Sequence, residues 1–179
     1  MGDAIEACEV CGYVWDAVTA TDAAVRARAS TEAFAALLEA HPEASLVRPS
    51  ADRWSALEYG CHTRDVLYNL RDRIVLGIVE DNPRPHALHG TPRVDGGLYA
   101  DDTPASLATD LRAAGELFAR TLDRMPRDAF DRPIHYSWPR EATRTLRWVA
   151  SQAVHECEHH LDDARENVSG DQSSAARLI

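Results

Sequence analysis

Residues 145–167 read TLRWVASQAVHECEHHLDDAREN, and this stretch predicts a long amphipathic helix. At about 100° per residue, an apolar stripe that includes Leu146 and Leu161 falls on one side of the helix, and His155 and His159 fall on the opposite side. A stripe of this kind is buried against other elements of a folded protein. The stretch therefore indicates one helix of a packed bundle, with a polar face that carries two histidines.

Start signals predict three further long helices. Ser55 and Glu58 form a capping box, in which each side chain accepts a backbone N–H of the first turn. Thr103 and Pro104 suit the N-cap and the first position of another helix, which continues to about residue 124. The first helix is expected to run from about Thr19 or Thr21 to Glu39, and the second, which begins at Ser55, to end at about Val79. The last helix is expected to run from Thr143 or Thr145 to about Asn167.

Four long helices without a strong strand pattern predict an all-α fold, a four-helix up-and-down bundle. The bundle is expected to span residues 16–167. An N-terminal arm, residues 1–15, carries Cys8-x-x-Cys11, and residues 168–179 are expected to form a flexible tail. Between the second and third long helices, residues 82–102 form a long loop, and residues 134–138 are expected to be briefly extended.

Composition narrows the class of protein. The chain has 179 residues, a length typical of one domain, and a net charge of −10, which disfavours a nucleic-acid partner. All 19 basic residues are arginine, which excludes Schiff-base chemistry on lysine. There is no apolar run of the roughly 20 residues that a membrane span needs, and the acidic first nine residues have no signal-peptide core. We therefore expect a cytoplasmic protein that does not bind membranes.

The histidines predict a metal site. His155 and His159 are four residues apart, so their imidazoles share one helix face and can bind the same ion. His62, near the middle of the second helix, is the third candidate, since facing helices of a bundle can bring it to this pair. His160 is turned about 100° from His159 and is the poorer candidate. Three imidazoles suit Zn, Ni, Fe or Co and leave a position open for water or substrate.

Helical periodicity alone leaves the surroundings of these histidines open. His62, His155 and His159 all stand on polar faces opposite apolar stripes. The two polar faces can meet across a wet cleft, or both can face solvent. The motif His155-Glu156-x-x-His159 also matches the HExxH pattern of metalloproteases, but no third ligand or strand pattern follows it, so Glu156 is expected to be a surface charge.

Cys8 and Cys11 form half of a zinc-binding pattern, because a closed site needs two more ligands. Cys61 and Cys157 lie inside helices and do not complete it. The pair can act as a redox couple, bind metal across a dimer, or remain as two reduced thiols.

The stretch WSALEYGCHTRD at residues 54–65, followed by HxxxH on the last helix, resembles the two motifs of DinB-like proteins over residues 16–167. The resemblance implies a four-helix bundle, a homodimer, and a divalent metal, typically zinc or nickel, held by His62, His155 and His159. Many such proteins are thought to be S-transferases that use mycothiol or bacillithiol. The all-arginine composition suits a GC-rich actinobacterium and hence mycothiol.

The resemblance and the residues together predict a metal-dependent thiol S-transferase. A metal in an open three-histidine site lowers the pKa of a bound thiol, and the thiolate attacks a small electrophile in the neighbouring cleft. Tyr59, Arg73 and Trp148 are expected to line this cleft and bind the thiol cofactor. No catalytic residue is assigned. The alternatives are a non-catalytic metal-binding stress-response protein and a metal-dependent hydrolase.

Overall fold

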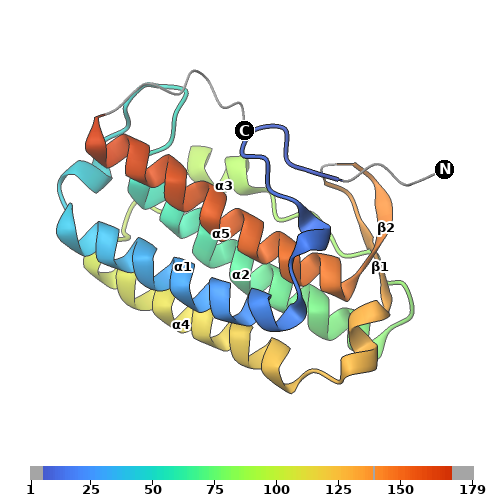
Figure 1. The fold of residues 1–179 in the computed structure, drawn as a ribbon. Helices are drawn as coiled ribbons and strands as arrows, with labels where there is room; N and C mark the ends of the chain where they lie inside the picture. The colour runs from blue at the N-terminus through green and yellow to red at the C-terminus, as the bar shows by residue number, and fades with distance from the viewer. Residues whose placement is uncertain (1–5, 139, 171–179) are drawn as a thin grey trace.

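The computed structural model describes residues 6–138 and 140–170, and four long helices dominate it (Figure 1). Each begins after a Ser or Thr whose side chain accepts a backbone N–H of the first turn: Thr19, Ser55, Thr103 and Thr145. The four-helix bundle predicted from the sequence is confirmed. The long helices are α1 (Ala20–Ala40), α2 (Ala56–Val79), α4 (Pro104–Arg124) and α5 (Leu146–Ser169).

The order of the helices in space differs from their order along the chain. α1 and α2 each pack against α4 and α5, so that α1 and α2 lie diagonally across the bundle. Figure 1 shows α1 and α5 running in one direction and α2 and α4 in the other. The consecutive helices α2 and α4 are therefore parallel, and the chain does not alternate strictly between up and down. This is possible because residues 80–103 are long enough to return along the bundle.

Short elements fill the connections. The long loop contains the six-residue helix α3 (Gly90–Asp95), and 3-10 helices occur at Trp15–Ala17, Ala44–Leu46 and Arg127–Asp131. Strands β1 (Pro133–Tyr136) and β2 (Ala142–Thr145) form an antiparallel hairpin in which Pro133 pairs with Thr145. The extended piece expected near residue 134 is thus present, and its partner strand leads directly into α5.

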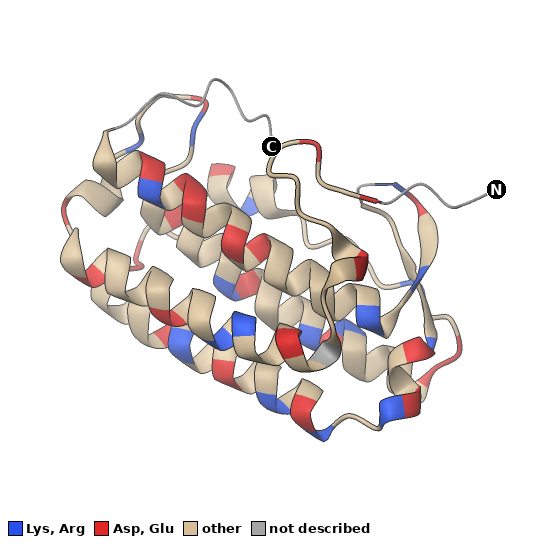
Figure 2. Ribbon diagram, viewed as in Figure 1, with Lys and Arg blue, Asp and Glu red and all other residues tan. Residues whose placement is uncertain are grey.

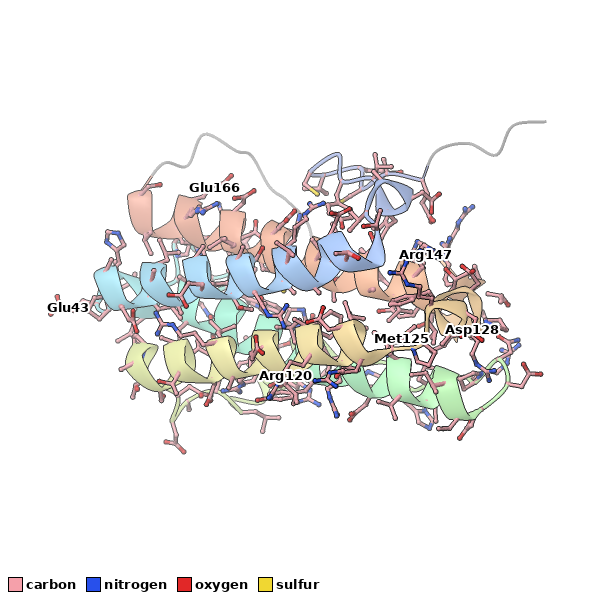
Figure 3. All side chains as sticks on the ribbon, turned by 60° about the horizontal axis from the view of Figure 1, so that its bottom comes forward. Glu43, Arg120, Met125, Asp128, Arg147 and Glu166 are labelled. Carbon is pink, nitrogen blue, oxygen red and sulfur yellow. The ribbon has the colours of Figure 1, made fainter. Side chains whose placement is uncertain are left out.

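The apolar stripe of α5 is buried as expected, but the opposite face of this helix is buried too. Trp148, Gln152 and His155 on the polar side are all inaccessible, with His155 only 2% exposed. Part of the cover is the segment ahead of α1, which lies over the half of α5 nearer to Arg147 (Figure 3, where Arg147 and Glu166 mark the two ends of α5). The described part of the arm therefore packs on the folded core, and Trp15 belongs to the larger apolar cluster of that core.

Charged residues of both signs are interleaved along α1 and α4 (Figure 2). Arg28 on α1 pairs with Glu116 on α4, and Arg112 on α4 pairs with Glu32 on α1. Water and salt screen exposed pairs of this kind, so they contribute little, and the bundle is stabilised mainly by burial of apolar surface. Within residues 6–138 and 140–170, none of the helices combines the length and apolar character of a membrane span.

Candidate metal centre

Four histidines form a row where α2 and α5 face each other. His62 comes from α2, His155 and His159 come from consecutive turns of α5, and His160 directly follows His159. The ring centroids of His62 and His160 are 5.0 Å apart, those of His160 and His159 are 5.2 Å apart, and those of His159 and His155 are 5.3 Å apart. The antiparallel packing of α2 on α5 places the three predicted ligands in one row, in which the ring beside His62 is that of His160. Among the described residues, His62 shares no group of ligand atoms within 4.8 Å with His155 or His159.

A cavity of about 320 Å³ opens beside this row. Of the two arrangements that helical periodicity left open, the structure has the cleft, because the polar faces of α2 and α5 meet across this cavity. Apolar side chains of α2 and of the loops, such as Leu70 and Leu88, form part of the remaining wall, together with the rings of Trp54, Tyr136 and Trp138. The lining includes His62, Asn69, Arg73, Tyr136, Trp138, Gln152, His155, Glu156, His159 and His160.

Two of the predicted ligands are imidazoles with buried, unpaired ring nitrogens. Within the described part of the chain, neither ring nitrogen of His155 has a hydrogen-bond partner, and neither does Nδ1 of His62. A buried polar atom left unpaired costs about 1–3 kcal/mol. Burial lowers the pKa of His155 to about 4 and also lowers the pKa of His62, so both rings are neutral at pH 7. Neutral imidazole is the form that binds a metal ion, so these two residues fit the role of ligands.

Glu156 is not the surface charge that the sequence suggested. Its carboxylate lies between two imidazoles, 3.6 Å from Nε2 of His62 and 3.3 Å from Nε2 of His160, and it accepts a 2.6 Å hydrogen bond from Gln152. Burial alone would raise the pKa of Glu156, but hydrogen bonding from His160 and the contact with His62 hold it well below its ordinary value. The carboxylate is therefore ionised inside the cavity wall.

His160, the poorer candidate by helical geometry, is also part of the cluster. Its Nδ1 lies 3.1 Å from Oδ2 of Asp163. Burial alone would lower the pKa of His160, but the hydrogen bonds to Asp163 and Glu156 raise it to about 9. His160 is thus a buried cation held between two carboxylates, which separates it chemically from the neutral His62 and His155.

The three residues expected to bind the thiol are placed differently from one another. Among the described residues, the cavity wall includes Arg73 but neither Tyr59 nor Trp148. The guanidinium of Arg73 donates to the carbonyl of His86 at 2.6 Å and lies over the ring of Tyr136. Tyr59 stacks on His160 instead, with ring centroids 5.3 Å apart. Trp148 stacks on the ring of Trp15 in the N-terminal arm.

Three overlapping groups of side chains within the described residues have ligand atoms within 4.8 Å of one another. The first group consists of His62, Glu156 and His160. The second consists of His159, His160 and Asp163. The third consists of His155 and His159 together with Cys8 and Cys11 of the N-terminal arm. The cluster therefore offers more than one ligand set, and both cysteines of the arm lie at the histidine pair.

Comparisons with known proteins place the chain in a family. Residues 26–164 match the model of the DinB superfamily, and the chain belongs to that superfamily. No curated protein is significantly similar to the sequence. Among solved structures, YfiT from Bacillus subtilis superposes with a TM-score of 0.64 at 18% identity, covering 82% of this chain and 86% of YfiT. YfiT is described as a probable metal-dependent hydrolase with an unusual four-helix bundle topology. This similarity supports the fold.

Proposed function

We propose that this protein is a metal-dependent thiol S-transferase. In this proposal His62, His155 and His159 bind a divalent metal, zinc in the first place and nickel in the second. The co-substrate is a low-molecular-weight thiol, namely mycothiol, and the acceptor is a small electrophile. The observation that carries the proposal is that His62 and His155, two neutral imidazoles with unpaired ring nitrogens, both line a cavity of about 320 Å³.

A divalent ion bound by three histidines lowers the pKa of a thiol in its open position. The chain itself supplies the surroundings. Arg73 offers a guanidinium in the cavity wall, which suits a carboxylate or other anionic group of the thiol. Trp138 is 46% exposed and lies in the cavity wall, where its ring can cover an apolar electrophile. The cavity volume falls within the range of ordinary small-molecule sites.

Glu156 favours a second candidate, a metal-dependent hydrolase. An ionised carboxylate in the cavity wall can accept a proton from an attacking water, which is the role of a general base. The description of YfiT as a probable metal-dependent hydrolase supports the same alternative. A thiol donor also loses a proton, so Glu156 is consistent with both reactions, and the requirement for a thiol distinguishes them.

The test is product formation from a panel of small electrophiles by zinc-loaded and nickel-loaded protein, with and without mycothiol. Thiol transfer that is lost in His62→Ala and His159→Ala, and kept in His41→Ala, would support the S-transferase. His41 is an exposed histidine after α1 and serves as the matched control. Product formed without any thiol would instead support the hydrolase.

Bound metal without turnover of any electrophile or ester, with or without thiol, would overturn the enzymatic proposal. It would leave the non-catalytic metal-binding role. The homodimer and the cytoplasmic location stay predictions.

A further inference from the structure

The two cysteines of the N-terminal arm are held side by side by a tight loop. The backbone N–H of Cys8 donates to the carbonyl of Tyr13 at 2.8 Å, and the N–H of Gly12 donates back to the carbonyl of Cys8 at 2.9 Å. Gly12 has φ +73°, a conformation that glycine adopts at little cost and other residues rarely adopt. The loop folds the segment between Cys8 and Cys11 back on itself, as the C-x-x-C halves of zinc sites require.

The arm is docked firmly on α5. The hydroxyl of Tyr13 donates to the carbonyl of Ser151 at 3.0 Å, and the indole N–H of Trp15 donates to the side-chain oxygen of Gln152 at 2.5 Å. The rings of Tyr13 and Trp15 lie 5.1 Å and 5.0 Å from the ring of His155. These contacts fix the cysteine loop next to the histidine pair, so its position there is not the accidental placement of a loose end.

The ligand atoms of Cys8, Cys11, His155 and His159 all lie within 4.8 Å of one another. Two thiols and two imidazoles, spaced C-x₂-C and H-x₃-H, are a donor set that structural zinc sites use. The unpaired ring nitrogens of His155 are a second, independent observation that this side chain is arranged for a ligand. Both missing partners of the cysteine pair thus come from the same chain.

We propose that Cys8, Cys11, His155 and His159 bind one zinc ion in a closed tetrahedral site. Zinc is favoured because thiolate ligands select soft or borderline metals over magnesium or calcium. Binding releases the two thiol protons to solvent. The ligand site requires no enzymatic activity and stands independently of the proposed function.

The consequence for catalysis does rest on the proposed function. The Cys₂His₂ set and the three-histidine set share His155 and His159, so one ion cannot be held fully by both. A four-ligand site has no open position for a substrate, whereas a three-ligand site has one. Zinc held by the two cysteines is therefore in a resting state. When the cysteines are released, the same ion passes to the open three-histidine site, where thiol transfer takes place.

The experiment is zinc X-ray absorption spectroscopy on the full-length chain loaded with one equivalent of zinc. The expected ligand shell contains two sulfurs at about 2.3 Å and two nitrogens at about 2.0 Å. Cys8→Ser combined with Cys11→Ser should lose both sulfurs. Cys157→Ala removes a buried thiol from the same helix as the histidines and should keep them.

The His62→Ala variant separates this proposal from the proposed function. It should keep the two-sulfur spectrum, because His62 is outside the Cys₂His₂ set, while losing thiol transfer. A wild-type shell of nitrogen and oxygen alone, or of one sulfur, would overturn the Cys₂His₂ site and leave the three-histidine centre standing. Sulfur that persists in the double cysteine variant would also overturn it, and a chain that binds no zinc would refute both.

Discussion

The substitution Glu156→Gln tests the electrostatic interaction between Glu156 and His160 in the histidine cluster. In the metal-free protein the Glu156 carboxylate lies 3.3 Å from Nε2 of His160 and 3.6 Å from Nε2 of His62. Glutamine has nearly the same shape but no charge. The substitution therefore leaves the packing in place and removes one of the two carboxylates that hold the His160 cation.

The size of the effect follows from the distance. Two unit charges 3.3 Å apart attract each other by about 5 kcal/mol at an effective dielectric constant of about 20. Asp163 stays in place at 3.1 Å from Nδ1 of His160 and keeps part of the stabilisation of the cation. One pKa unit corresponds to about 1.4 kcal/mol, so even a quarter of the lost attraction lowers the pKa of His160 by about one unit. We expect a fall of at least that size from the value of about 9.

The assay is an NMR pH titration of the histidine ring signals in metal-free protein. Glu158→Gln is the matched control, because Glu158 is on the same helix but pairs with Arg26 of α1. It should leave the His160 titration where it is. An unchanged His160 pKa in Glu156→Gln, or an equal shift in Glu158→Gln, would refute the assignment of Glu156 as the partner of His160.

Three further outcomes are expected. Gly90→Ala would place a Cβ 2.6 Å from the His62 ring, so it should shift the NMR signals of this ring and lower the thiol-transfer rate about 10- to 100-fold. Gly77→Ala is the control, because its Cβ would overlap to a similar extent with the end of the Leu146 side chain and should change neither the signals nor the rate. Trp15→Ala empties a buried site on α5 and should lower the free energy of unfolding in urea by about 3–5 kcal/mol, and a loss below about 1 kcal/mol would show that the arm is not part of the core. Removing bound metal with a chelator should lower the melting temperature by about 5–10 °C, if the metal had been present at about 100 times its dissociation constant, and the His155→Ala variant should not respond.

Local signals account for the parts of the fold that could be predicted. The capping residues Thr19, Ser55, Thr103 and Thr145 mark helix starts because a side chain must satisfy the free N–H groups of the first turn. These signals depend only on near neighbours in the sequence. The parallel direction of α2 and α4 could not be predicted in this way, because it depends on the path of residues 80–103 through space.

The candidate site shows the same division. His62, His155 and His159 share a cavity, as the spacing of the histidine pair and the bundle geometry indicated. The position of Glu156 in the cavity wall and its contact with His160 could not be predicted, because a helical wheel with one apolar and one polar side assumes only two environments. α5 has three, since its histidine face lies under the arm and the next face turns toward α2.

The role of the arm depends on contacts between residues more than 130 positions apart, such as the hydrogen bond between Trp15 and Gln152. No pattern within the arm shows where it docks. The aromatic residues that follow the cysteines, Tyr13 and Trp15, were the available signal. Two large aromatic side chains within three residues are more consistent with a docked segment than with a solvated one.

The most direct test of the proposed metal centre is the metal content of the untagged full-length protein, purified without chelator. It is measured by plasma mass spectrometry beside the His155→Ala variant. His155 belongs to both proposed ligand sets, so its loss should affect either. We expect about one equivalent of zinc or nickel per chain in the wild type and the loss of most of this metal in the variant. A wild type that holds no metal even after reconstitution, or a variant that keeps the full equivalent, would contradict this expectation.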